Sequence, residues 1–153
     1  MSVEIEIVRE ASDDVVAALG HLLPQLSTTA KALDREAVGR LLTFEANTVL
    51  VARLQGRIVG TLTLVIFPLP SGLRARLEDV VVDEAARGQG IAAALTDEAL
   101  ALARKSGVRT VDLTSRPSRE AANRLYERAG FQRRESIVYR FTLDGRNVNA
   151  GAL

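Results

Sequence analysis

A run of three valines leads into a glycine-bearing turn, and this turn opens a long helix rich in Ala and Leu. The stretch reads Val80-Val81-Val82-Asp83-Glu84-Ala85-Ala86-Arg87-Gly88-Gln89-Gly90-Ile91-Ala92. The first turn of a helix leaves backbone N–H groups without internal partners, and the helix dipole adds partial positive charge there. A buried strand, a turn and a helix start in this order predict an anion-binding site within an α/β fold.

The turn itself has the small residues that a phosphate site needs. Gly88 and Gly90 let an anion approach the backbone, Ala92 is nearly as small, and Arg87 offers a fork of donors. Glycines at a helix start can also serve only the tight packing of a helix on a sheet. The Arg-x-x-Gly-x-Ala spacing between a strand and a helix favours the phosphate site. It is neither a Rossmann Gly-x-Gly-x-x-Gly nor a Walker loop, which disfavours dinucleotides and nucleoside triphosphates.

The remaining patterns predict a single α/β domain over residues 1–143, followed by a flexible tail at 144–153. Strands are expected at 3–9, 48–54, 57–67, 74–82, 109–114, 131–134 and 137–143, and helices from Ser12 or Asp13 to 23, then at 34–44, 89–106 and 118–129. A hairpin turn is expected at 55–56 and a loop at 68–72. The buried helix stripes are expected to contain Val16, Leu19 and Leu23, then Ile91, Leu95, Ala99 and Leu102, and finally Ala122, Leu125 and Ala129.

Composition excludes several kinds of chemistry. The 153 residues include no cysteine, so disulfides, thiolate metal sites and a cysteine nucleophile are excluded. The N-terminus does not resemble a secretory leader and no apolar run approaches the ~20 residues of a membrane span, so we expect a cytoplasmic protein. The net charge is +1 and aromatic residues are few, which disfavours nucleic acid as a partner. The arginines of the second half form either a solvated surface or a local field for an anionic ligand.

A second block of residues combines an amide with a phenol. It reads Asn123-Arg124-Leu125-Tyr126-Glu127-Arg128-Ala129-Gly130-Phe131. Residues three apart are neighbours on a helix, so Tyr126 presents its hydroxyl beside the Asn123 amide. A tyrosine hydroxyl can donate a proton to a departing thiolate, and an amide can pair with an amide of a ligand. Tyr126 alone would more simply be a half-buried aromatic side chain.

The two blocks together resemble the GNAT N-acetyltransferase superfamily. The stretch from Arg87 to Ala92 is similar to its Arg/Gln-x-x-Gly-x-Gly/Ala motif, and 123–131 to its Asn-x-x-Tyr-x-x-x-Gly-Phe pattern. The resemblance implies a mixed, mostly antiparallel sheet with helices on both faces, and acetyl-CoA as acyl donor. It implies a strand that splays from its neighbour to receive the pantetheine arm. The cofactor-binding residues implied in this way are Val80, Val81, Val82, Arg87, Gly88, Gln89, Gly90, Ile91, Ala92, Asn123 and Tyr126.

An acceptor amine needs a base, because at neutral pH only about one lysine-like amine in a thousand is unprotonated. Glu78 is the first candidate. Strict alternation along the strand would place it on one face with Val80 and Val82, and Asp79 on the other with Leu77 and Val81. Both carboxylates could instead be surface charges at a strand end. His21, the only histidine, lies on the first helix and is most simply an exposed residue.

The resemblance implies a direct transfer of acetyl to a primary amine within a ternary complex, with no metal. A backbone N–H near Val80 would polarise the thioester carbonyl and Tyr126 would protonate the leaving thiolate. The alternative is a protein on the same fold that senses acyl-CoA, or binds a partner, without turnover. Small-molecule and peptide amines both remain open as acceptors, and a homodimer is one of the oligomeric states that the resemblance allows.

Overall fold

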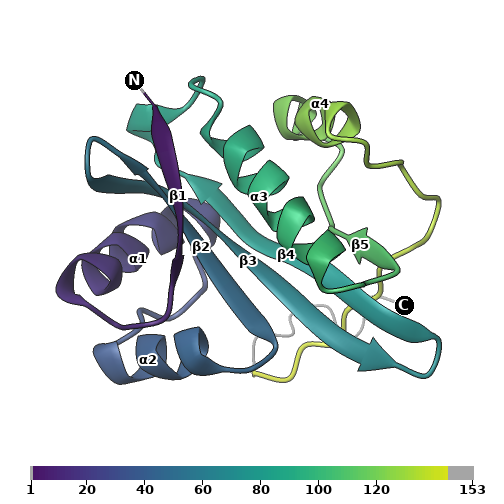
Figure 1. Cartoon of the computed structure of the whole chain (residues 1–153), viewed down its shortest axis with the longest axis horizontal. Helices are drawn as coiled ribbons and strands as arrows, with labels where there is room; N and C mark the ends of the chain where they lie inside the picture. Colours follow the sequence, from purple (N-terminus) through teal and green to yellow (C-terminus); the bar gives the residue numbers. More distant parts are fainter. Residues whose placement is uncertain (1, 145–153) are drawn as a thin grey trace.

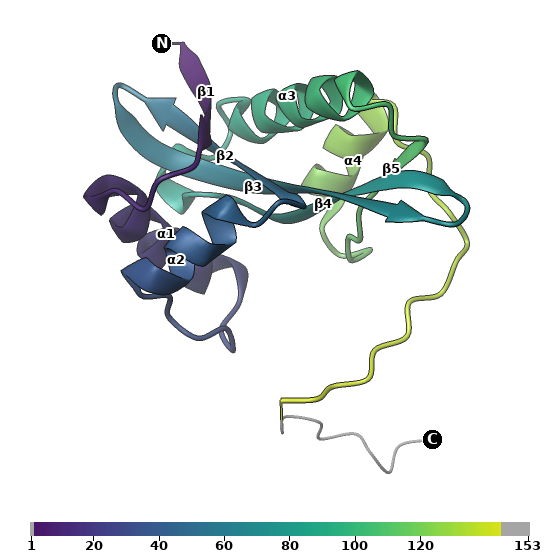
Figure 2. The ribbon, with the colours of Figure 1, turned by 60° about the horizontal axis from the view of Figure 1, so that its bottom comes forward.

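The computed structural model describes residues 2–144, which form one five-stranded sheet with helices on both faces (Figures 1 and 2). The strands follow the chain in order across the sheet. They are β1 (Val3–Val8), β2 (Asn47–Leu54), β3 (Arg57–Leu69), β4 (Gly72–Val82) and β5 (Thr110–Asp112). The first four are antiparallel and β5 is parallel to β4. The mixed, mostly antiparallel sheet expected from the sequence is therefore confirmed.

The helices cover the sheet in pairs. On one face lie α1 (Asp13–Leu26) and α2 (Arg35–Thr43), and on the other lie α3 (Ile91–Lys105) and α4 (Glu120–Arg128), as Figure 2 shows. A short 3-10 turn, η1 (Glu84–Ala86), joins β4 to the approach of α3. In the part of the chain that the structure describes, no helix has the length and apolar character needed to cross a membrane.

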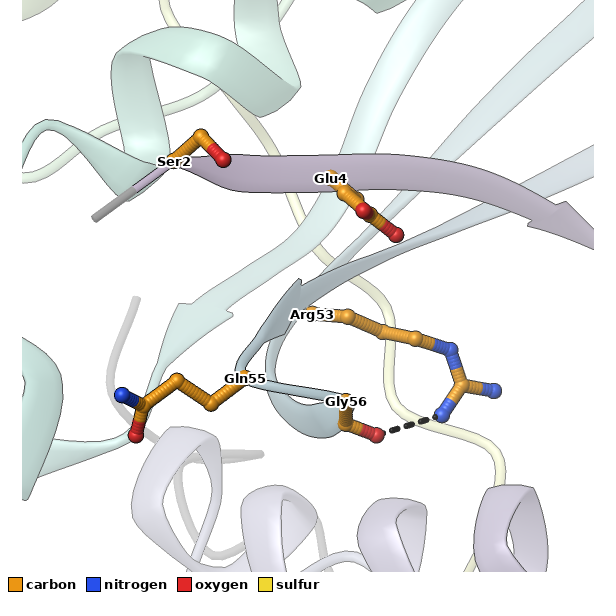
Figure 3. A pocket seen from close by; sticks show the side chains of 5 residues that line it. All are labelled: Ser2, Glu4, Arg53, Gln55 and Gly56. Atoms are coloured by element: carbon orange, nitrogen blue, oxygen red, sulfur yellow. Dashed lines mark hydrogen bonds between the residues drawn. The ribbon is translucent and has the colours of Figure 1, made fainter.

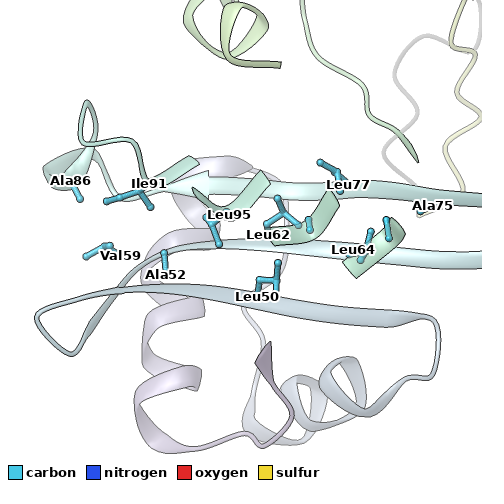
Figure 4. Close-up of a cluster of buried hydrophobic side chains, with 12 residues drawn as sticks. Leu50, Ala52, Val59, Leu62, Leu64, Ala75, Leu77, Ala86, Ile91 and Leu95 are labelled. Atoms are coloured by element: carbon cyan, nitrogen blue, oxygen red, sulfur yellow. The ribbon is translucent and has the colours of Figure 1, made fainter. Parts of the chain in front are cut away.

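The α3 layer is fixed to the sheet by an aliphatic core (Figure 4). Ile91, Leu95 and Ala99 of α3 are buried, as their spacing predicted. At Gly60 of β3 the approach is so close that a Cβ atom would lie 3.2 Å from Ile91 Cγ2 and 3.3 Å from Leu95 Cδ1. Since both contacts involve the first turns of α3, this glycine sets how close the helix start lies to the sheet.

The N-terminal helices form a second core, and here the predicted stripe was displaced. Val15 and Leu22 are the fully buried residues of α1. Of the predicted stripe, Val16 and Leu19 pack against this core as partly buried residues, and Leu19 and Leu23 also line a pocket between the helices and the sheet. On α4 the most buried residue is Tyr126 rather than the predicted alanines and leucine. Periodicity located each apolar face, but packing against the partner decided which residues occupy its centre.

Three element boundaries differ from the sequence predictions. The predicted loop at 68–72 is a tight hairpin, because β3 continues through Pro68 to Leu69 and Leu69 pairs with Gly72. Pro68 is tolerated there because β2 no longer pairs with this end of β3, so no N–H is needed on that side. The helix expected to be capped by Ser118 begins after Arg119, and the strand expected at 109–114 is confined to β5.

The strands predicted at 131–134 and 137–143 were wrong. No described residue after α4 belongs to a strand, and the chain runs away from the sheet as an extended arm (Figure 2). The alternating pattern was present, but a strand also needs a neighbour to pair with, and within residues 2–144 this segment has none. Of the tail predicted at 144–153, only residue 144 lies within the described residues.

Candidate functional site

The N-terminus of α3 carries the geometry expected of an anion site. Gly88 and Gly90 have φ values of 81° and 77°, in the left-handed region that glycine adopts without strain. A Cβ atom at either position would meet no other atom within 4 Å, so the space beside the turn is open. No side chain caps the helix at Gly90. The first N–H groups of α3 are thus available to an anion.

The strand that leads to this turn is paired on one side only over its second half. β5 pairs with β4 at Arg74, Ala75 and Arg76, whereas β4 continues to Val82. The predicted separation of this strand from its neighbour is present in the structure. Arg87 reinforces the end of β4, because its Nε donates to the Val82 carbonyl oxygen at 3.3 Å. Both the β4 edge beyond Arg76 and the start of α3 thus carry backbone groups without a partner in this pairing.

A β-bulge interrupts β4 between these features. Thr63 pairs with Glu78 and Thr61 with Val81, so β4 contains one extra residue over this interval. Asp79 takes the strain of the bulge, with a φ of 50°. The bulge reverses the alternation: Leu77, Val80 and Val82 all pack toward the α3 core. The expectation that Glu78 shares a face with Val80 and Val82 was therefore wrong.

The two carboxylates at the bulge have different surroundings. Glu78 Oε2 accepts from Arg76 Nε at 2.7 Å, and the Arg76 guanidinium also donates to the Thr114 hydroxyl at 3.0 Å. Asp79 faces the pocket beneath α1 and α2 instead. Water reaches its side chain, yet burial by the surrounding protein, together with the charge of Glu78, raises the pKa of Asp79. Asp79 is thus the carboxylate that faces the pocket, whereas Glu78 is paired with Arg76.

The pocket beneath α1 and α2 is almost entirely apolar. Its lining comes from both helices, their connection and strands β2 to β4, and comprises Leu19, Leu22, Leu23, Leu26, Leu33, Leu41, Val49, Thr61, Thr63, Asp79 and Val81. Sequence reasoning missed this lining, although Thr61 and Thr63 alternate along β3 and so had to share a face. Asp79 is the only ionisable group among these residues.

Tyr126 lies on the other side of the sheet, on α4. It is 8% exposed and its ring meets the Phe131 ring edge-on, with centroids 5.9 Å apart. Burial raises the pKa of the Tyr126 hydroxyl, against an opposing effect of Arg119. The hydroxyl therefore keeps its proton at neutral pH. Among the described residues no hydrogen bond joins Tyr126 to Glu78, Asp79 or Arg87, while the Asn123 amide donates to the Arg116 carbonyl at 3.0 Å.

His21 connects α1 to the turn after β4. Its Nε2 lies 3.2 Å from Asp83 Oδ2, and Gln25 contacts both residues while accepting from the Glu84 N–H at 3.0 Å. Burial raises the pKa of Asp83, but the bonds from Ala85, Gln25 and His21 outweigh it and lower that pKa overall. The network fixes α1 to the segment that leads into the glycine turn before α3, which is a positioning role.

A second hollow lies at the far edge of the sheet (Figure 3). Its lining is Ser2, Glu4, Arg53, Gln55 and Gly56. The Arg53 guanidinium there is already engaged with Glu6, Asp14 and the Gly56 carbonyl. None of these five residues belongs to β4, to the turn at Arg87–Gly90 or to α3. Residues 2–144 contain no group of three or more His, Cys, Asp or Glu side chains that could hold a metal ion.

Comparison with known protein families decides the family. The model of the acetyltransferase (GNAT) family matches residues 18–131, which is more than half of the chain. The chain belongs to the GNAT acetyltransferase family. The matched region includes α1 from residue 18 onward, the bulged strand, the α3 turn and Tyr126. A comparison with curated protein sequences finds no significant match.

Solved GNAT structures share the fold over nearly the whole chain. A ribosomal-protein-alanine N-acetyltransferase from Brucella melitensis is 26% identical, with a TM-score of 0.73 over 92% of this chain and 100% of that one. A transcriptional regulator from Bacillus halodurans is also 26% identical, with a TM-score of 0.78 over the same shares. An aminoglycoside acetyltransferase from an uncultured soil sample is 22% identical, with a TM-score of 0.79 over 92% and 95%, and shows the fold alone.

Proposed function

We propose that the chain is an acetyl-CoA-dependent N-acetyltransferase that passes acetyl directly to a primary amine. The observation that carries this proposal is the uncapped start of α3, with its two left-handed glycines, beside the open edge of β4. Proteins of the GNAT family generally use acetyl-CoA, and the ribosomal-protein-alanine N-acetyltransferase at 26% identity supports an amine acceptor.

The residues around the turn suit the two ends of coenzyme A. The backbone from Gly88 to Ala92 would hold the pyrophosphate, since it combines free N–H groups with open space beside both glycines. The exposed Arg87 adds a positive charge at the same point. The β4 backbone from Val80 to Val82 would pair with the amides of the pantetheine arm, because β5 leaves that edge unpaired.

The reaction needs a base that takes a proton from the acceptor ammonium and an acid that gives one to the leaving thiolate, and the chain has a residue for each. Bound acetyl-CoA supplies the thioester carbonyl that the amine nitrogen attacks, with formation of the C–N bond and loss of the C–S bond. Asp79, whose carboxylate faces the pocket, removes a proton from the ammonium on that side. Glu78 is a second candidate for this base, but its carboxylate is already paired with the Arg76 guanidinium.

We assign Tyr126 as the acid that donates a proton to the leaving thiolate. Its buried hydroxyl stays protonated at neutral pH, as a donor must. The absence of cysteine excludes an acyl-enzyme on sulfur, which supports a direct transfer with donor and acceptor bound together. The competing function is an acyl-CoA sensor without turnover, which the regulator from Bacillus halodurans makes worth testing.

The test is calorimetric titration of the purified chain with acetyl-CoA. We expect one site of micromolar affinity, lost in an Arg87→Ala, Gly90→Glu double variant that places a carboxylate at the turn. Arg104→Ala is the matched control, because Arg104 is exposed at the opposite end of the same helix. No binding by folded wild-type protein would refute the acetyltransferase function. Binding without acetyl transfer to any primary amine would instead support the sensor.

A further inference from the structure

The pocket beneath α1 and α2 constrains the amine more closely than the family does. We propose that the acceptor is a primary amine carried on an apolar body, such as an alkylamine, an arylalkylamine or the N-terminus of an apolar residue. This inference rests on the proposed acetyl transfer. Eight of the eleven lining residues are Leu or Val, two are Thr and one is Asp. A sugar or a polyamine would leave its polar groups unpaired against such walls.

The position of the one carboxylate defines the orientation of the ligand. Asp79 stands on β4 next to the open strand edge, while the leucines of α1 and α2 lie across from it. An ammonium group paired with Asp79 therefore directs its substituent between the helices. The Thr61 hydroxyl donates to the Leu50 carbonyl at 2.8 Å and carries no charge, so Asp79 is the stronger partner for an ammonium group. One end of the acceptor is recognised by charge and the other by burial of apolar surface.

The experiment compares n-alkylamines from ethylamine to hexylamine, with phenethylamine as an aromatic case and glucosamine as a polar-bodied amine. Release of the coenzyme A thiol is followed with a thiol reagent, and the chain contributes no background because it has no cysteine. Each added methylene should raise kcat/KM about threefold until the pocket is filled. Glucosamine should fall at least tenfold below hexylamine.

Variants then tie the preference to the pocket. Leu26→Asn adds a polar group to the lining and should remove most of the gain from ethylamine to hexylamine, with little change for ethylamine itself. Leu69→Asn is the matched control, since Leu69 is an exposed leucine on the β3–β4 hairpin. Equal kcat/KM along the alkylamine series, with acetyl-CoA binding intact, would overturn the substrate class and leave the proposed function standing. Loss of acetyl-CoA binding would remove both.

A second observation, independent of the pocket, concerns the C-terminal arm, defined here as residues 132–143. Its large apolar side chains are exposed: Ile137 73%, Val138 65%, Tyr139 87%, Phe141 82% and Leu143 87%. Four of them alternate at odd positions, so an extended chain presents them on one face. Within the described chain no hydrogen bond joins the arm to any other residue. A surface of this kind marks an interface.

The same chain offers the complementary surface. β5 closes the sheet and pairs only with β4, so its other edge is free among the described residues. We infer that two copies of the chain exchange arms, each arm adding a strand to the β5 edge of the other copy. Figure 2 shows the arm running away from its own sheet. Donor strand and acceptor edge occur on one chain, which allows a closed two-fold dimer. The exposed Asp112 on β5 and Arg140 in the arm match in charge.

Light scattering and cysteine cross-linking test the exchange. The wild type should have the mass of a dimer, and Tyr139→Asp with Phe141→Asp should give a monomer with unchanged melting temperature after correction for concentration. Chains with Asp112→Cys and a second cysteine at position 138, 140 or 142, on the face of the arm that carries Arg140, should form a covalent dimer in at least one case. Asp112→Cys alone is the control. A wild-type monomer, or a disulfide closed within one chain, would overturn the inference.

Discussion

Tyr126 is held in place by packing rather than by hydrogen bonds, so its hydroxyl can be removed without disturbing its ring. Tyr126→Phe retains the edge-on contact with Phe131. We expect kcat to fall about 100-fold, the usual contribution of a positioned acid, while affinity for acetyl-CoA and the melting temperature stay near wild type. Thiol release under saturating substrates measures the change. An unaltered kcat would assign the leaving-group proton to another donor.

Asp79 carries an energetic cost that its removal should reveal. Because the pKa of Asp79 is raised in the folded chain, ionisation favours the unfolded state. The cost is complete above the raised pKa and disappears below the ordinary value. Asp79→Asn should therefore raise the melting temperature by about 1–3 °C at pH 7.5, a small effect because the side chain is exposed.

The same substitution should abolish most of the activity, which separates the two roles of Asp79. Thermal melts monitored by circular dichroism at pH 7.5 and pH 3.5 provide the stability arm, and the gain should vanish at the lower pH. Arg76→Gln releases Glu78 from its ion pair and serves as a comparison. A lower melting temperature at pH 7.5 for Asp79→Asn would mean that the carboxylate stabilises the bulge instead.

At the level of elements, the α3 start depends on how closely the helix approaches β3. Gly60→Ala would place a Cβ 3.3 Å from the Val81 carbonyl oxygen and closer still to Ile91. The helix must shift by a few tenths of an ångström, at a cost of about 1–2 kcal/mol. We expect the melting temperature to fall by roughly 3–6 °C and acetyl-CoA binding to weaken with it. Gly39→Ala in α2 meets no atom within 4 Å and should be neutral or slightly stabilising.

The strand–turn–helix from Val80 to Ile91 was predictable because its determinants are local. Two glycines set the backbone of the turn, and the Ala- and Leu-rich stretch favours a helix whatever surrounds it. The bulge at Asp79 was not predictable, since it arises from the register between β3 and β4 and not from the β4 sequence. Because the bulge was not foreseen, the sequence prediction placed Glu78 on the wrong face of the sheet. It also did not identify Asp79 as part of the leucine-lined pocket.

Across the whole molecule, the sheet separates α1 and α2 from α3 and α4, and hydrogen bonds join α1 to the turn after β4. The side-chain Oε1 of Gln25 on α1 accepts from the Glu84 N–H, four residues before Gly88. The sequence predicted both layers of helices but not the isolation of the arm, because alternation in residues 137–143 says nothing about which strand, or which copy, will pair with it. The arm's failure to pair is a property of one chain considered alone.

Binding of acetyl-CoA should stabilise the folded chain against unfolding. Acetyl-CoA at about 100 times its Kd adds ~2.7 kcal/mol to the free energy of unfolding, which corresponds to a rise in melting temperature of roughly 5–10 °C. The Arg87→Ala, Gly90→Glu variant should show no rise. The variant with Tyr139→Asp and Phe141→Asp should show the full rise, because neither arm residue lies near the α3 turn in the fold. If the arm variant also loses the shift, exchange of arms is required to complete the coenzyme site.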